Sequence, residues 1–377
     1  MSRTAGAVAV LSSCLGACLI VATVGAQSPA PAAWNAKAAG AYLDARQLWW
    51  QSWPNASRDH DTFCVSCHTA VPYAIARSSL RAALHESGSS EAEQKLIANV
   101  TKRVRMWKDV EPFYPDQVRG LPKTSESRGA ESVMNALILT SRDAESGSLS
   151  DDARLALDNM WALQFKTGEQ NGAWAWLNFT YQPWESADSP LFGASLAAVA
   201  IGTAPGGYSS TPAIQDRVKA LREYLHKGAE TPNLFNRAML LWGSSKLGGV
   251  LSAAERQASI DALIAKQQGD GGWSTATLAP NYKRQDGSAL DMNSDGYATA
   301  VIAFVLQQAG LPRSPSNVAR GLMWLNQHQD RTDGRWAASS LNKQRDPASD
   351  AGKFMSDAAT AFAVLALTDT QHGQGSR

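Results

Sequence analysis

Gln267-Gln268-Gly269-Asp270-Gly271-Gly272-Trp273 is the stretch that decides the fold. It ends an amphipathic helix expected over residues 252–268, and similar stretches end two other such helices. These read Trp161-Ala162-Leu163-Gln164 followed by Asn171-Gly172-Ala173-Trp174, and Trp324-Leu325-Asn326-Gln327 followed by Asp333-Gly334-Arg335-Trp336. In each, Gln can cap backbone groups at the helix end, Gly permits the turn, and Trp can pack over the next hairpin. The repetition predicts a chain of similar helical hairpins whose tryptophans have a structural role.

The expected helices alternate between two textures. One is amphipathic: in residues 214–227 the apolar side chains form a single stripe and charged residues cover the rest. The other is apolar nearly all round, as in residues 297–306, which predicts a helix enclosed by protein. The amphipathic helices are expected at 34–50, 91–109, 151–165, 212–227, 252–268 and 315–328. Their buried partners are expected at 69–84, 128–141, 189–202, 232–247, 295–309 and 355–367.

Twelve helices in this order bury their apolar faces most simply as a closed ring of six outer/inner hairpins. The sequence therefore predicts an all-α fold, an (α/α)6 toroid, as a single domain over residues 27–377. An open solenoid is the alternative, although obvious capping repeats are missing.

The Gln-Trp repeats resemble those of squalene-hopene cyclases and related terpenoid cyclases, whose fold is an (α/α)6 toroid. The resemblance covers most of the chain after Asp151 and implies the fold more strongly than an activity. A cyclase would also carry an Asp-x-Asp-Asp-Thr-Ala-like segment at the start of an inner helix. The nearest segments here contain Asp295 and Asp357, each with a Thr-Ala pair but without the carboxylate cluster that makes a strong acid. We therefore expect both residues to cap their helices, with catalysis as the alternative.

Two other families with this fold fit less well. Protein prenyltransferases hold zinc with Asp, Cys and His, and the mature chain has no spare cysteine for such a site. Thioester-containing toroids need a Cys-Gly-Glu-Gln segment, which this sequence lacks.

Cys64-Val65-Ser66-Cys67-His68 is an attachment sequence for c-type haem. Two thiols three residues apart can bond the two vinyl groups of one porphyrin, and the adjacent imidazole can then ligate the iron. Cys64 and Cys67 are the expected tethers of one covalently attached haem c, and His68 is the expected proximal ligand. A disulfide and half of a zinc site are the competing interpretations; zinc needs about four ligands, which weakens the second.

The N-terminal segment indicates export. Arg3, the apolar run 5–24 and the small residues before Gln27 are typical of a signal peptide at 1–26 with a cleavage site. Lipidation of Cys18 and an uncleaved anchor are lesser alternatives. Cleavage would leave Cys64 and Cys67 as the cysteines of a periplasmic or secreted protein. Export suits haem c, which is attached outside the cytoplasm in c-type cytochromes.

In an outer-then-inner array, every outer-to-inner connection lies at the same end of the ring. The haem motif falls in the first of these connections, so its distal ligand must come from that end. Met355, just before the sixth inner helix, is the leading candidate because ring closure places the sixth hairpin beside the first. Met106, Met292 and His60 follow. The long connections at this end also hold possible pocket-lining residues without an assigned role: Tyr181, Trp184, Glu185, Tyr282 and Arg345.

These features predict an exported monohaem protein that transfers electrons to or from a redox partner protein. Oxidation of an apolar, terpenoid-like small molecule by the haem is the alternative. A divergent terpenoid cyclase and a sensing module are less favoured. The formal net charge of +1 gives no electrostatic case for nucleic acid or for a membrane surface beyond the signal segment.

Overall fold

The computed structural model describes Met1 and residues 33–279, 282–314 and 316–369. The chain divides into two units, 1–32 and 33–377. The predicted signal peptide, apart from Met1, lies outside the described residues. None of the helices in the described ranges has both the length and the hydropathy needed to cross a bilayer.

The outer layer consists of amphipathic helices, most of which start at a side-chain cap. Ser90, Ser150, Ser252 and Ser316 each accept a hydrogen bond from a backbone N–H in the first turn, and Asn35 does so for the first helix. Such caps satisfy backbone donors that have no partner within the helix, so they fix where these helices begin. The outer helices are α1 (Ala36–Ser52), α3 (Glu91–Arg105), α6 (Asp151–Ala162), α8 (Gln215–Lys227), α10 (Ala253–Ile264) and α13 (Asn317–His328).

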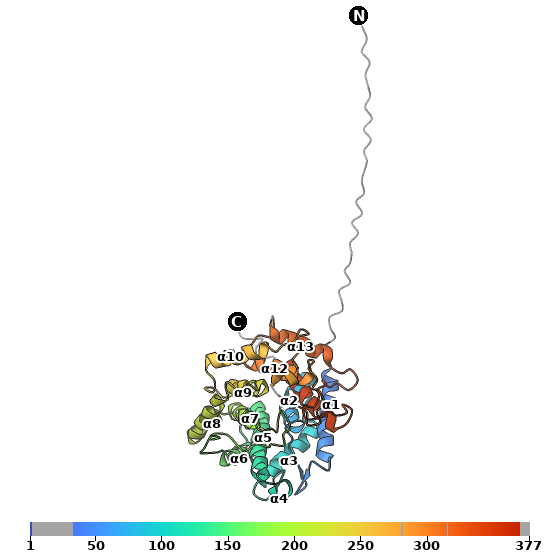
Figure 1. The fold of residues 1–377 in the computed structure, drawn as a ribbon. Helices are drawn as coiled ribbons and strands as arrows, with labels where there is room; N and C mark the ends of the chain where they lie inside the picture. The colour runs from blue at the N-terminus through green and yellow to red at the C-terminus, as the bar shows by residue number, and fades with distance from the viewer. Residues whose placement is uncertain (2–32, 280–281, 315, 370–377) are drawn as a thin grey trace. The chain divides into compact units, whose positions relative to one another are not determined.

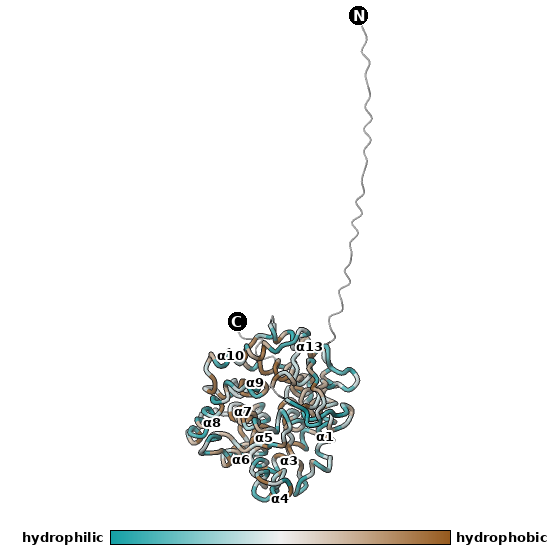
Figure 2. The backbone as a smooth tube through the Cα atoms, viewed as in Figure 1, coloured by the Kyte–Doolittle hydropathy of each residue, from teal (hydrophilic) through white to brown (hydrophobic). Residues whose placement is uncertain are grey.

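The inner layer consists of helices that are buried almost all round. They are α2 (Ala70–Leu84), α5 (Lys123–Ser146), α7 (Ser189–Thr203), α9 (Leu234–Lys246), α12 (Gly296–Gln308) and α14 (Phe354–Thr368). Each packs against the next in this order, and α14 packs back against α2 (Figure 1). In Figure 2 the hydrophobic colour is concentrated on inner helices such as α9, and the hydrophilic colour is common on outer ones such as α8. The ring is therefore closed, which confirms the (α/α)6 toroid and excludes the open solenoid.

Short elements occupy the connections. Strands β1 (Ser57–Arg58) and β2 (Thr62–Phe63) form an antiparallel hairpin between α1 and α2. Two single-turn helices, α4 (Asp116–Arg119) and α11 (Thr275–Leu278), precede inner helices, as does the 3-10 turn η3 (Ala351–Lys353). Two further 3-10 turns, η1 (Tyr208–Ser210) and η2 (Pro212–Ile214), lead into α8.

The three repeat tryptophans have the predicted structural role. Trp174, Trp273 and Trp336 are completely buried. Each indole N–H donates to a backbone carbonyl near the end of its own outer helix, at distances of 2.6 Å, 2.8 Å and 2.8 Å. The ring of Trp273 also lies against Gly321 of the next outer helix, so close that a Cβ there would lie 2.8 Å from it. The tryptophans thus connect consecutive hairpins.

The repeat glutamines join each turn to the start of the next outer helix. The Gln164 amide donates to the carbonyls of Gly172 and Arg217, and the Gln267 amide donates to those of Gly271 and Asn317. In the third repeat this residue is Gln329, which donates to Gly334 and Asn35.

The prediction that Gln327 is the repeat glutamine of the third hairpin was therefore wrong. Gln327 still lies inside α13 and is exposed, whereas Gln329 lies just beyond its end. Because Asn35 caps α1, the contact of Gln329 closes the outer ring between the sixth and first hairpins.

Replacing Gln329 with alanine should destabilise the toroid by about 2–3 kcal/mol. The substitution removes three side-chain hydrogen bonds, including one that the Asn35 N–H donates to Gln329 Oε1 at 2.6 Å. Urea unfolding followed by circular dichroism measures the change. Gln327→Ala is the matched control, and its effect should stay within about 0.5 kcal/mol because the residue is exposed. Equal effects of the two substitutions would contradict the assignment.

Candidate functional site

The haem motif is held rigidly in the connection between α1 and α2. The Trp50 indole N–H donates to the Cys64 carbonyl at 2.7 Å, and the Cys64 N–H donates to the Ala56 carbonyl at 2.8 Å. Asn99 of α3 pairs with both backbone groups of Phe63. The Ser66 hydroxyl accepts from two backbone N–H groups at the start of α2. These contacts fix the loop from both sides.

Both cysteines carry free, buried thiols. Cys64 and Cys67 are each 5% exposed. Burial raises the pKa of Cys64 to about 12 and that of Cys67 well above its usual range, and the nearby Glu185 carboxyl adds to both shifts. The Cys67 sulfur lies 3.5 Å from the thioether sulfur of Met134 on α5. The thiols are therefore protonated groups in an apolar setting and form no disulfide in this structure.

Aromatic rings pack around the half-buried His68 imidazole. Phe354 stacks on it with ring centroids 4.0 Å apart, and Trp50 meets it edge-on at 4.9 Å. Trp184 lies at 5.9 Å. Burial lowers the pKa of His68 to about 3, with smaller contributions from Arg46 and Arg345. The imidazole is consequently neutral, which is the form that ligates metals.

A chain of hydrogen bonds fixes the tautomer of this imidazole. His68 Nδ1 lies 2.8 Å from the Thr69 hydroxyl, which donates to Asp357 Oδ2 at 2.7 Å. Both oxygens of Asp357 also accept from Arg46, so the carboxylate has no proton to give to Thr69. The hydroxyl proton is thus used on Asp357, and Thr69 accepts from His68 Nδ1–H. This leaves the lone pair of His68 on Nε2.

The two inner-helix aspartates have different roles, and the expectation of a cap was wrong for Asp357. Asp295 is the N-cap of α12 and accepts from the N–H groups of Tyr297 and Ala298, as expected. Asp357 lies inside the first turn of α14 and forms an ion pair with Arg46 at 2.8 Å. Burial raises the pKa of Asp357, against the opposing effects of Arg46, Thr69 and Tyr42. Its position beside the ring seam, next to α1, makes it a partner of Arg46 instead of a backbone cap.

The residues of the motif fit a c-type haem better than a bare metal ion. In the described ranges, no three His, Cys, Asp or Glu side chains converge as a metal site would require. Haem c needs only the imidazole for its iron and uses the two thiols for the porphyrin edge. The Nε2 lone pair of His68 and the free thiols of Cys64 and Cys67 are the groups that such an attachment would use.

The candidates for the distal ligand differ in burial. Met355 is buried and directly follows Phe354, the residue that stacks on His68. Met106 is half-buried at the end of α3, and Met292 is 56% exposed. The exposed His60 has a left-handed backbone conformation with φ of 52°. Its Nε2 atom lies 3.5 Å from Asp59 Oδ2.

Sequence reasoning missed Met134. Its thioether is the sulfur that contacts Cys67. The sequence signal that could have identified it was a methionine in the inner helix α5.

Two of the possible lining residues lie directly at this site. Trp184 contacts His68 and donates from its indole to the Tyr297 hydroxyl at 2.8 Å. Burial raises the pKa of Glu185 to about 7, and its charge affects both thiols. Arg345 affects His68 only through its charge. Tyr282 instead hydrogen-bonds Asn233, and Tyr181 is exposed.

No protein-family model and no curated protein matches this chain. Among solved structures, it is similar to an inactive variant of the alpha-1,6-mannanase GH76A of Salegentibacter sp. HEL1_6, in complex with alpha-1,6-mannotetrose. The TM-score is 0.51 and the identity 10%, with 88% of this chain and 99% of that chain covered. It also matches ent-copalyl diphosphate synthase from Streptomyces platensis, with a TM-score of 0.45 and 16% identity. That match covers 78% of this chain and 50% of the synthase.

At such low identity, the likeness to the mannanase supports the α/α toroid and nothing further. The fold and this comparison together place the chain in the class of all-α toroids.

Proposed function

We propose that this chain is an exported c-type haem protein that transfers electrons, with the toroid as its scaffold. The observation that carries the proposal is the Cys64 to His68 motif with its Thr69–Asp357 hydrogen-bond chain. Cys64 and Cys67 would hold the porphyrin, and His68 would ligate the iron through Nε2. When bound, the haem supplies one-electron redox chemistry.

The residues around the motif support this role. Asp357 and Thr69 hold the Nδ1 proton of His68, which orients the ring and increases its basicity as a ligand. The rings of Trp50, Phe354 and Trp184 pack against the imidazole and hold it in place. We propose that Met355 would be the second protein ligand of the iron, because it is buried and directly follows Phe354, which stacks on His68. A six-coordinate iron favours electron transfer with a redox partner over oxidation of a bound substrate.

Carbon monoxide distinguishes these functions. The full-length protein, purified from cells with a cytochrome c maturation system, should show a low-spin c-type spectrum that carbon monoxide does not change. Met355→Leu should open the site and allow rapid carbon monoxide binding. Met292→Leu, at an exposed position, is the control and should behave like the parent protein.

Rapid carbon monoxide binding by the parent protein would favour an enzyme or a sensor instead. If Met355→Leu leaves the spectrum unchanged, Met355 is not the ligand. Met134→Leu then tests the methionine that contacts Cys67.

A further inference from the structure

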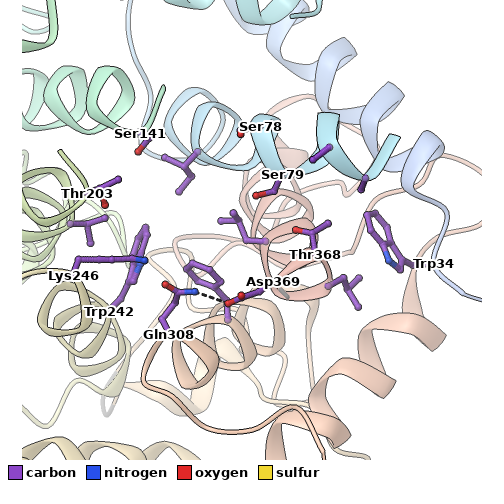
Figure 3. Close-up of a pocket in the computed structure, with 17 residues that line it drawn as sticks. Trp34, Ser78, Ser79, Ser141, Thr203, Trp242, Lys246, Gln308, Thr368 and Asp369 are labelled. Carbon is purple, nitrogen blue, oxygen red and sulfur yellow. Dashed lines mark hydrogen bonds between the residues drawn. The ribbon is translucent and has the colours of Figure 1, made fainter. Parts of the chain in front are cut away.

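A second site lies at the opposite end of the ring from the haem motif. Here a cavity of about 710 Å³ opens between the C-terminal ends of the inner helices (Figure 3). All of the inner helices contribute to its lining, from Ser78 on α2 to Leu365 on α14. Its volume lies within the range of about 300–1,000 Å³ that is typical of small-molecule sites. None of the residues of the haem motif lines it.

The walls of the cavity combine an apolar, partly aromatic surface with the polar side chains of Ser78, Ser79, Ser141, Thr203 and Thr368. Trp242 and Phe304 line it with their rings edge to face, 5.4 Å between centroids. Phe362 packs behind both of them. Val199, Ile75 and Leu365 complete the apolar surface. Such walls favour the hydrocarbon part of a ligand because binding removes apolar surface from water.

Trp242 and Lys246 line the cavity from one face of α9. The indole nitrogen of Trp242 is buried, with the residue only 4% exposed, and no described residue accepts its hydrogen bond. Because this nitrogen is shielded, Trp242 offers the cavity its ring surface and not a donor. Lys246 lies one helical turn further along, and Figure 3 shows its side chain beside the Trp242 ring. Burial lowers the pKa of Lys246, and Asp369 only partly opposes this effect.

Among the residues that line the cavity, Lys246 is the cation that could pair with an anion. Asp369 accepts from the Gln308 amide at 2.6 Å, so its carboxylate already has a donor. The carbonyl ends of the inner helices add weak negative potential, which falls off within the last turn. An ammonium at the last turn of α9 offsets this potential and can pair with a carboxylate directly.

We infer that this cavity binds an amphiphilic carboxylate, with the carboxylate on Lys246 Nζ and the hydrocarbon part against Trp242, Phe304 and Val199. The site is separate from the haem motif, so it does not depend on the proposed electron transfer.

Calorimetric titration of the full-length protein with oleate, below its micelle concentration, tests the inference. The parent protein should bind one oleate saturably, and methyl oleate, which lacks the charge, should bind at least about tenfold more weakly. Lys246→Met should weaken oleate binding about tenfold or more, and should leave methyl oleate binding unchanged. Trp242→Ala removes the ring against which the hydrocarbon part would lie, and should weaken binding of both ligands several-fold.

Lys219→Met is the matched control, because Lys219 lies on the outer helix α8 with a side chain that is 76% exposed. It should bind oleate like the parent protein. Circular dichroism confirms that each variant is folded, and the haem spectrum should be the same in all of them. Absence of saturable oleate binding would overturn the inference, as would equal binding of oleate and methyl oleate or unchanged affinity in Lys246→Met.

Discussion

Joint replacement of Cys64 and Cys67 by serine should abolish covalent haem attachment completely. The hydroxyl groups cannot form the thioether bonds that hold a c-type porphyrin, while the loop keeps its backbone contacts to Trp50 and Asn99. Haem staining of a denaturing gel and intact mass measure the outcome. The parent protein should retain its colour and mass increment after denaturation, and the double variant should lose both.

Ser66→Ala is the control within the same motif. It removes the hydroxyl that accepts from the first N–H groups of α2, at a cost of about 1 kcal/mol, but leaves both thiols in place. This variant should therefore keep its haem. A parent protein that is colourless after expression with the maturation system, with both thiols open to alkylation, would reject the haem assignment.

Replacing Asp357 with alanine should have the largest effect on stability, a loss of about 3 kcal/mol or more. Arg46 and Asp357 are 7% and 1% exposed, so the substitution leaves a buried guanidinium with Asp350 as its remaining acidic partner. The Thr69 hydroxyl also loses its acceptor and can then donate to His68 Nδ1. This would place the imidazole proton on Nε2, the nitrogen needed for iron. Urea unfolding and the haem spectrum measure the two effects.

The sister residue Asp295 gives the matched comparison. Asp295→Ala removes a helix cap and the hydrogen bonds from Thr275, and it leaves no buried cation without its partner. It should destabilise the protein less than Asp357→Ala and leave the haem spectrum unchanged. A spectrum that is equally unaffected in both variants would show that Asp357 does not control His68.

The fold could be predicted from the sequence because the two patterns that indicate it, the apolar stripe of each outer helix and the Gln-Trp repeat at its end, are local. All of the expected helices are present in the described ranges, and the predicted span 189–202 became α7, Ser189–Thr203. Helix boundaries were predicted less well where the apolar and polar pattern continues beyond the end of the helix. The predicted helix 91–109 ends at Arg105, and α5 begins earlier than expected, at Lys123. Tertiary contacts decide such ends, since Arg103 and Glu131 form a buried ion pair that ties these two helices together.

The candidate site was only partly accessible to sequence reasoning. The motif itself could be recognised because its residues are consecutive. The roles of Asp357, Arg46 and Phe354 could not, because they reach His68 across the ring seam from distant parts of the chain. A lone aspartate near a helix start has the same local pattern whether it caps the backbone, as Asp295 does, or pairs with a buried arginine.

Trp34 and Asp369 both line the cavity at the carboxyl end of the inner helices. Polypeptide joined to Trp34 or to Asp369 therefore starts from that rim. A circularly permuted chain, cut in an exposed connection and joined across this rim, would preserve every hairpin.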